Sequence, residues 1–233
     1  MNEIIWGKNS INEAIKNKRI LKAYLVKDSA YIDIFNAEGI PFKIVKKFDL
    51  DKMSNYQNHQ GIIAEIKEYE LSSVEDMIKD HNGLIVILDG LKDPHNLGAI
   101  LRTADCVGAD GLIYKKHNSV KLGATAAKIS SGAIEYVKVA EVTNLVNTIK
   151  KLKKAGYWIV GTAANANQSY TDIDFNMNVA IVIGSEGEGM SRLVREECDF
   201  LTSLPMHGHV DSLNASVAAG ILMYRVLASR QGK

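Results

Sequence analysis

Cysteine is scarce in this chain of 233 residues, which contains only Cys106 and Cys198. The two lie far apart in the sequence and do not form the clustered pattern of a metal site, so a reducing compartment is the simplest interpretation. The sequence also lacks an apolar run long enough to span a membrane. Its first residues, MNEIIWGKNS, lack the basic and then apolar layout of a signal peptide. We therefore expect a soluble, cytoplasmic protein without a membrane partner.

An excess of charge of either sign is absent too. The 28 lysines and arginines nearly balance the 27 aspartates and glutamates, so the formal net charge is only +1. This balance excludes attraction of a nucleic acid by the whole surface, and such a partner would have to be held by a local patch. The chain does have an ordinary globular composition, with 46% hydrophobic and 24% charged residues, enough for one large domain or two modest ones.

The first part of the chain alternates between helical and strand patterns on a short scale. The patterns predict helices over residues 10–18 and 29–39 and strands over 20–26, 42–47 and 61–67. We interpret residues 1–70 as a small α/β domain. The more polar stretch over 71–82 is then a linker between this domain and the rest of the chain.

From residue 83 to residue 233 the pattern becomes longer and more regular. The predicted strands cover residues 84–88, 111–114, 135–139, 157–162, 179–184 and 200–206. Most are separated by helix-length stretches, such as NLGAILRTADCVG and VTNLVNTIKKLKKAG. Apolar strands that alternate with helices predict an α/β domain with a mainly parallel sheet covered on both faces. Ligands bind such sheets at the carboxyl ends of the strands, so the loops at those ends are the candidate sites.

The first such loop follows the strand over 84–88 and contains Asn96, Gly98 and Arg102. Asn96 could simply cap a helix, and Arg102 could pair with Asp105 on the helix surface. Gly98 suggests that this helix start has a role beyond capping. Glycine destabilises a helix relative to alanine, so its presence indicates that a nearby group needs the space.

The second loop, VIGSEGEGMSR, places glycines at 184, 187 and 189. This G-x-x-G-x-G spacing differs from the dinucleotide fingerprint, and the loop lacks the lysine of a phosphate-binding loop. Glu186 and Glu188 would repel a pyrophosphate, which disfavours a nicotinamide or ATP enzyme. A cationic adenosine ligand without phosphates, such as S-adenosylmethionine, fits better. The alternative is a turn that only caps a helix beginning near Met190.

The third loop leads into a final apolar helix that begins with four polar side chains, Asp211, Ser212, Asn214 and Ser216. Asp211 or Ser212 can serve as the N-cap, which accounts for one of the four. The others must satisfy one another or face a ligand, because a buried polar group without a partner costs about 1–3 kcal/mol. His207 and His209 form an H-x-H pair in this loop, but without neighbouring carboxylates or cysteines we expect no metal.

Taken in order, the segments NLGAILRTA, VIGSEGEGMSR and LPMHGHVDSLNASVAAGI resemble the three motifs of the SpoU (TrmH-type, SPOUT) family of RNA ribose 2′-O-methyltransferases. The resemblance includes KISSGAIEYV and WIVGTAA. At the N-terminus, WGKNSINEAI and NHQGIIAEI look like the small RNA-binding domain, of L30e-like fold, in the subfamily that methylates guanosine in 23S rRNA. The departures are small: Lys138 stands where proline is usual, and two histidines lie within the third motif.

The resemblance implies a deep trefoil knot in the second domain, a homodimer whose active site is completed across the interface, S-adenosylmethionine as cofactor and RNA, not DNA, as partner. The catalytic residues that it implies are Asn96, Arg102, Glu186, Ser212 and Asn214. The implied cofactor-binding residues are Thr162, Ala163, Ile183, Gly184, Gly187, Leu204, Met206 and Leu213. Candidate phosphate contacts in the first domain are Lys16, Lys18, Arg19, Lys22, Lys43, Lys46 and Lys47, although such a cluster alone more often forms a solvated face.

Arg102 is the base in the usual assignment for this family, but a guanidinium with a pKa above about 12 is a poor base, so we favour a role in orienting the ribose or its phosphate. The reaction that the resemblance implies is 2′-O-methylation of a ribose, with a guanosine in 23S rRNA as the first choice. A tRNA or an antibiotic-resistance target is the alternative within the family. A non-catalytic RNA-binding ribosome-assembly factor of the same fold is the alternative outside it.

Overall fold

The computed structural model describes residues 3–79, 83–163, 166 and 168–232. The chain divides into two compact units. Unit 1 contains residues Met1–Glu70 and Leu122–Tyr136, and unit 2 contains Leu71–Lys121 and Val137–Lys233. Residues 80–82 of the predicted linker lie outside the described residues. The rest of that linker includes helix α4 (Val74–Lys79), which belongs to unit 2 and buries Val74 and Met77 in its core.

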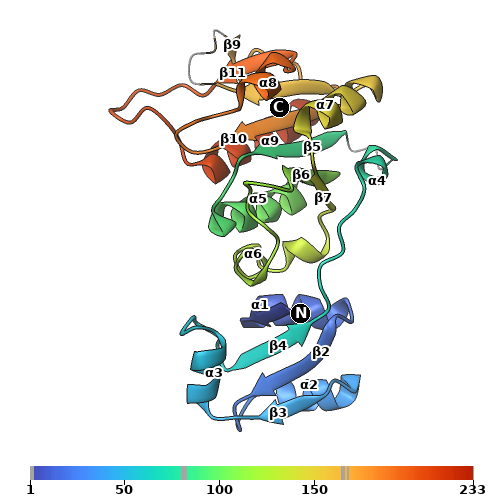
Figure 1. The fold of residues 1–233 in the computed structure, drawn as a ribbon, viewed down its shortest axis with the longest axis vertical. Coiled ribbons are helices and arrows are strands. Elements are labelled where there is room, and N and C mark those ends of the chain that lie inside the picture. Colours follow the sequence, from blue (N-terminus) through green and yellow to red (C-terminus); the bar gives the residue numbers. More distant parts are fainter. Residues whose placement is uncertain (1–2, 80–82, 164–165, 167, 233) are drawn as a thin grey trace. The chain divides into compact units, whose positions relative to one another are not determined.

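Unit 1 is built on a four-stranded sheet in the order β1-β4-β2-β3 (Figure 1). Its strands are β1 (Glu3–Trp6), β2 (Ile20–Leu25), β3 (Phe42–Ile44) and β4 (Ile62–Ile66). Strand β4 runs antiparallel to both neighbours, whereas β2 and β3 are parallel. The helices are α1 (Lys8–Lys16), α2 (Tyr31–Glu38) and α3 (Lys47–Met53). Gly39 caps the C-terminus of α2, and its φ of 66° suits glycine. The predicted alternation of short helices and strands is confirmed.

The segment over 122–136 belongs to unit 1 although it lies far along the chain. It forms α6 (Ala124–Ile129) and a 3₁₀ turn, η1 (Ala133–Glu135). The predicted strand over 135–139 is therefore wrong. Glu135 ends the 3₁₀ turn and accepts from Arg19 at 3.2 Å, and strand pairing begins only at Val139. The local structure around Glu135 is therefore stabilised by Arg19, which lies 116 residues away in the sequence.

Unit 2 contains a seven-stranded sheet in the order β7-β6-β5-β10-β8-β11-β9, and every pairing in it is parallel. The strands are β5 (Leu84–Asp89), β6 (Gly111–Lys115), β7 (Val139–Val142), β8 (Trp158–Thr162), β9 (Gln168–Ser169), β10 (Val179–Gly184) and β11 (Phe200–Ser203). Strands β5 and β10 are buried throughout, as two-sided coverage requires. The predicted α/β domain with a mainly parallel sheet is confirmed.

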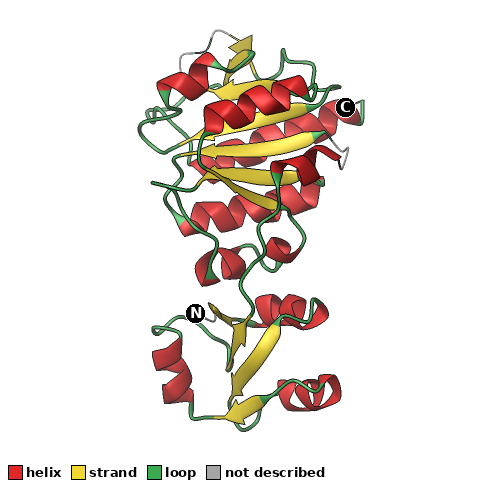
Figure 2. Ribbon diagram, turned by 45° about the vertical axis from the view of Figure 1, so that its right-hand side comes forward, coloured by secondary structure: helices red, strands yellow, loops and turns green. Residues whose placement is uncertain are grey.

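Helices cover both faces of this sheet (Figure 2). On one face, α4, α7 (Leu145–Lys154) and α8 (Arg192–Glu196) share a core with Ile85, Ile87 and Ile113. Because side chains alternate along a strand, Val86 and Leu88 point to the other face. Helices α5 (Pro94–Val107) and α9 (Ala215–Arg230) cover that face and pack against each other. Within the part of the chain that the structure describes, no helix has the length and apolar character to cross a membrane.

Strand β11 is shorter than the predicted strand over 200–206. It ends at Ser203, where its pairing with Ser169 of β9 also ends. Pro205 follows two residues later, and proline has no N–H to donate to a neighbouring strand. The loop that continues to Asn214 therefore starts at the carboxyl edge of the sheet.

Candidate active site

Three side chains from three distant segments meet in a hydrogen-bonded network in unit 2. Asn96 lies in the first turn of α5, Glu186 lies in the turn after β10, and Asn214 immediately precedes α9. Asn96 Nδ2 donates to Glu186 Oε1 at 2.9 Å, and Asn214 Nδ2 donates to Asn96 Oδ1 at 2.9 Å and to Glu186 Oε1 at 2.6 Å. The three segments singled out from the sequence thus share one polar site.

Asn96 is not the N-cap of α5. That position belongs to Asp93, whose Oδ1 accepts from His95 N at 2.8 Å, with Pro94 as the first helical residue. Asn96 is only 6% exposed. Its amide needs partners at both ends, and Glu186 and Asn214 provide them.

Glu186 Oε1 accepts a third hydrogen bond, from the backbone N–H of Ala215 at 3.3 Å. Ala215 is the first residue of the 16-residue helix α9, so the carboxylate stands at the positive end of a helix dipole. Two side-chain amides and one helix N-terminus therefore hold this acidic group in place.

Asn214 caps α9, and the prediction of Asp211 or Ser212 as the N-cap is wrong. Asn214 Oδ1 accepts from the backbone N–H groups of Ser216 at 3.0 Å and Val217 at 3.3 Å, and from Ser216 Oγ at 2.6 Å. Its Nδ2 is then left for Asn96 and Glu186. One side chain thus both starts the helix and completes the network, and Asp211 and Ser212 remain exposed in the preceding loop.

Arg102 and Ser212 are not part of the network. Arg102 is exposed on α5, six residues beyond Asn96 and thus roughly 120° round the helix. Within the described ranges, no residue forms an ion pair or hydrogen bond with the side chain of Arg102, so the alternative of a surface pair with Asp105 is not observed. Ser212 likewise contacts no hydrogen-bond partner among the described residues.

The backbone geometry of the turn after β10 accounts for the three glycines in this segment. Ser185 and Gly189 exchange backbone hydrogen bonds of 3.0 Å in both directions, which closes the turn. A side chain on Gly184 would collide with the backbone of Gly189. Gly187 and Gly189 have φ values of 87° and 68°. The spacing therefore builds a tight turn that presents Glu186 and Glu188, in place of a phosphate cradle.

The candidate cofactor residues lie on segments that end side by side. Thr162 ends β8 and Ala163 follows it, Ile183 and Gly184 end β10, and Leu204 and Met206 follow β11. Gly187 lies in the turn after β10, and Leu213 lies just before α9. Strand β8 pairs with both β10 and β11, so these carboxyl ends are neighbours. Thr162 Oγ1 donates to Val182 O at 3.3 Å, and Ala163 N donates to Thr202 O at 2.9 Å, which ties the three ends together.

The candidate RNA contacts are all in unit 1. Lys18, Lys43, Lys46 and Lys47 are exposed. Lys16 forms a surface pair with Glu13, and Lys22 lies over the ring of Tyr24. Arg19 differs, because its guanidinium bonds Glu135 and lies 3.8 Å from the centre of the Tyr69 ring. Its charge is thus largely engaged inside the unit.

Neither loop histidine belongs to a metal cluster. Across the described ranges no group of three or more histidine, cysteine, aspartate or glutamate side chains is arranged to hold a metal ion. One acidic residue of the sheet edge escaped sequence reasoning, namely Asp89. It ends β5, is almost fully buried, and accepts from Ser191 N at 2.6 Å. The sequence does contain a signal for this residue, because a carboxylate at the end of an otherwise apolar strand is unusual.

Comparisons with known proteins cover nearly the whole chain. The family model described as "SpoU rRNA Methylase family" matches residues 83–224, and the model described as "RNA 2′-O ribose methyltransferase substrate binding" matches residues 4–72. The chain is 45% identical over 240 residues to the putative TrmH family tRNA/rRNA methyltransferase YacO of Bacillus subtilis, which covers 98% of this chain and 96% of the relative. A relative of the same description from Staphylococcus aureus (strain COL) is 46% identical over 239 residues, covering 97% and 96%.

Solved structures give the same result for the fold. The SpoU methyltransferase AviRb from Streptomyces viridochromogenes, in complex with the cofactor AdoMet, matches with a TM-score of 0.85 at 23% identity, over 99% of this chain and 91% of that one. An RNA 2′-O ribose methyltransferase matches with a TM-score of 0.84 at 27% identity, over 98% and 88%.

Proposed function

Because this chain belongs to the SpoU family of RNA methyltransferases, we propose that it methylates the 2′-hydroxyl of a ribose, with a guanosine of 23S rRNA as the target. The observation that carries the proposal is the hydrogen-bonded network of Asn96, Glu186 and Asn214. It joins all three motif segments at the carboxyl edge of a parallel sheet, where such folds bind their ligands.

The cofactor of the proposed reaction is S-adenosylmethionine, which supplies the methyl group when bound. AviRb was solved with AdoMet, as was an rRNA methyltransferase from Sinorhizobium meliloti. In this chain the neighbouring ends of β8, β10 and β11 offer backbone groups for an adenosine. The turn beside them carries Glu186 and Glu188 and no basic side chain, which suits a cationic sulfonium and not a polyphosphate.

The chain's own residues supply positioning. Methylation of a 2′-hydroxyl needs the oxygen in line with the methyl group and a partner for its proton, so orientation provides much of the rate. In the proposal the network fixes the start of α9 against α5, and Ser212 and Arg102 orient the ribose or its phosphate. Arg102 is suited to this because its five donors remain unengaged within the described chain.

We also propose a homodimer that completes the active site. Apolar side chains on α9 are exposed, with Val217 48% and Tyr224 52% accessible, and α5 beside it presents Arg102 to solvent. A second copy would cover the apolar face and bring its Arg102 to the partner's site. Analytical ultracentrifugation should give a dimer that Tyr224→Glu disrupts, whereas Leu193→Glu, at an equally exposed site on α8, should not. The trefoil knot, the L30e-like fold of unit 1 and a cytoplasmic location stay predictions.

Methyl transfer from tritiated S-adenosylmethionine tests the function. The RNA should come from a Bacillus subtilis strain that lacks YacO, so that sites modified by that relative are open. Label in 23S rRNA at a guanosine 2′-oxygen is expected. Label only in tRNA would select the alternative target. No label and no cofactor binding by calorimetry would instead indicate a non-catalytic RNA-binding factor.

Arg102→Ala tests the role of that side chain. The variant should bind S-adenosylmethionine as the wild type does but lose methyl transfer. Turnover equal to the wild type would remove Arg102 from the mechanism. Arg195→Ala, on the surface of α8, is the matched control for loss of one arginine charge.

A further inference from the structure

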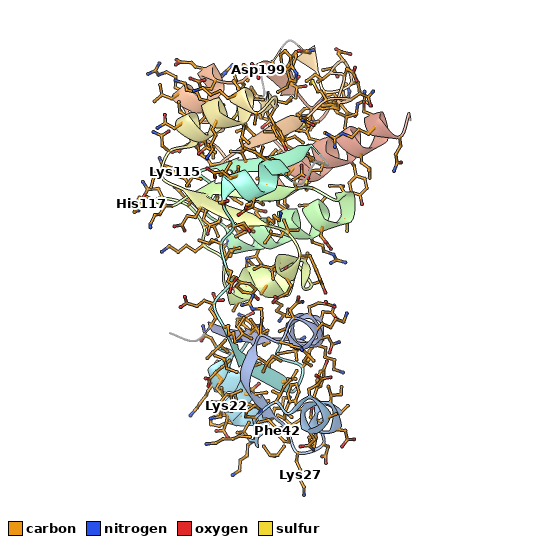
Figure 3. All side chains as sticks on the ribbon, turned by 90° about the vertical axis from the view of Figure 1, so that its right-hand side faces the viewer. Lys22, Lys27, Phe42, Lys115, His117 and Asp199 are labelled. Carbon is orange, nitrogen blue, oxygen red and sulfur yellow. The ribbon has the colours of Figure 1, made fainter. Side chains whose placement is uncertain are left out.

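A cavity of about 300 Å³ lies at the carboxyl edge of the unit 2 sheet, apart from the network. Its walls include Asp89 at the end of β5, Lys92 in the following loop, Lys115 at the end of β6, His117 just beyond it and Glu188 in the turn after β10. Figure 3 shows Lys115 and His117 on the same side of unit 2. The volume is at the small end of ligand sites, which span roughly 300–1,000 Å³, and suits one nucleobase better than a whole cofactor. We call it the edge cavity.

The edge cavity and the network lie on opposite faces of the sheet. Asp89 and Lys115 continue the alternation of Ile87 and Ile113, which face the core under α4, α7 and α8. Asn96, by contrast, belongs to α5 on the other face. The turn over residues 185–189 serves both sites, because Glu186 bonds the network while Glu188 lines the cavity.

The charges in the edge cavity are mixed and mostly unengaged. Asp89 is 7% exposed, and one of its oxygens accepts from Ser191 N, which anchors the start of α8. The side chains of Lys92, Lys115 and Glu188 form no ion pair or hydrogen bond with any described residue. The charged groups that a ligand meets here are therefore two carboxylate acceptors and two ammonium donors, with the side chains of His117 and Asn118 beside them.

This donor and acceptor set selects the class of ligand. Because two carboxylates stand beside two lysines, their charges offset each other, and neither a phosphate alone nor a simple cation gains a net attraction. Guanine presents adjacent N–H donors on its Watson–Crick edge and the acceptors O6 and N7 beside them. Adenine offers a single amino donor next to acceptors, so it cannot give a carboxylate two hydrogen bonds side by side. Guanine is thus the base whose edges match both kinds of group.

We propose that the edge cavity is a base-reading subsite for an unpaired guanine of the substrate RNA. Glu188 accepts from guanine N1–H and N2–H, Lys115 donates to O6, and Lys92 contacts the phosphate of the same nucleotide. Enzymes that recognise single-stranded RNA read splayed bases on such edges. The subsite rests on the proposed function, since it places the guanine beside the turn that also carries Glu186.

Nucleotide binding to the full chain tests the subsite, with GMP, IMP and AMP as probes in NMR titrations at millimolar concentration. GMP should shift the resonances of Lys115 and Glu188 and bind at least about fivefold more tightly than AMP, the lower end of what a paired base contact provides. IMP, which lacks the N2 amino group, should bind more weakly than GMP. Glu188→Gln should abolish the difference between GMP and IMP.

Matched controls separate a specific contact from a change in charge. Lys115→Ala should weaken GMP binding at least fivefold, whereas Lys116→Ala, which removes a neighbouring lysine 3.8 Å from Glu141, should not. Glu196→Gln, which neutralises a carboxylate paired with Arg192, is the control for Glu188→Gln. Equal binding of GMP and AMP, or retention of the GMP preference in Glu188→Gln, would overturn the subsite.

The two proposals fail in different ways. Methyl transfer to RNA with no GMP response in the edge cavity would overturn the subsite and leave the proposed function standing. Guanine-selective binding without methyl transfer to any RNA would overturn the proposed function and leave a guanine site that does not serve methylation. With both in place, Glu188→Gln should raise the KM for RNA, because the subsite holds the substrate.

Discussion

Replacing Asn214 with aspartate separates the two tasks of this side chain. Its Oδ1 caps α9 by accepting from the backbone N–H groups of Ser216 and Val217, and its Nδ2 donates to Asn96 and Glu186. Aspartate keeps the acceptor and caps as well as asparagine does. It removes the donor, however, and brings a second carboxylate next to Glu186. Asn214→Ala, in comparison, removes both tasks.

The two variants should lose stability for different reasons. Loss of the cap in Asn214→Ala should cost about 1 kcal/mol, which lowers the Tm by about 2–4 °C in a domain of this size. In Asn214→Asp the cap remains, but two charges about 4 Å apart repel by about 1 kcal/mol in water and about 4 kcal/mol at an effective dielectric constant of 20. Glu186 and position 214 are both exposed, so the value should fall near the lower limit.

Thermal unfolding at several pH values distinguishes the two variants. In Asn214→Asp the close carboxylates raise the pKa of the pair in the folded state. The loss of stability should therefore be present at neutral pH and disappear in the acidic range, where one of the two carboxylates binds a proton. The deficit of Asn214→Ala should not show this recovery. Methyl transfer should fall by about 100-fold in Asn214→Asp at neutral pH, because the network no longer fixes α9 against α5.

Two results would refute this reasoning. An Asn214→Asp deficit that is independent of pH would mean that the new carboxylate does not feel Glu186. Unchanged methyl transfer in a folded Asn214→Asp protein would mean that the network has no part in positioning. Asn147→Asp, at an exposed site in the first turn of α7, controls for the added charge alone.

Three further predictions concern other parts of the chain. Gly184→Ala should lower stability by roughly 1–3 kcal/mol in calorimetry, because a Cβ there would collide with the backbone of its own turn, whereas Gly208→Ala, which meets open space, should have little effect. Burial raises the pKa of Glu3, whose Oε2 has no partner among the described residues. Since the charged form is the costly one, Glu3→Gln should raise the Tm at neutral pH and lose this advantage as the pH falls through the raised pKa. Burial also raises the pKa of the Cys198 thiol to about 12, so a thiol reagent at neutral pH should label the exposed Cys106 quickly and Cys198 slowly, and equal rates would contradict the burial.

The sheet of unit 2 could be predicted because its signals are local. The segment VAIVIG is apolar at every position, which a strand buried on both faces requires, and β10 covers the same six residues. Because ligands bind at the carboxyl ends of such strands, three loops are candidate sites, and the structure joins them through Asn96, Glu186 and Asn214.

The segment over 122–136 could not be predicted in the same way. EYVKV has a strand-like pattern, but Arg19 and Tyr69 hold Glu135 in a 3₁₀ turn within unit 1. These partners are distant in sequence, and no local propensity encodes them. The same limit applies to Arg19 itself. Its place in a run of basic residues suggests an RNA contact, which stays a prediction, but no local pattern indicates its ion pair with Glu135.

The start of α9 shows why the choice of a cap needs the tertiary structure. Asp211, Ser212 and Asn214 all belong to residue types that cap helices well, so local chemistry cannot choose between them. Asn214 is selected because an asparagine has both an acceptor and a donor, and Glu186 needs the donor at the point where the helix needs the acceptor. An aspartate or a serine in this place could satisfy the helix alone. The polar beginning of an otherwise apolar helix is therefore set by the carboxylate that it faces, which is why Asn214 should be the least replaceable of the polar side chains in that loop.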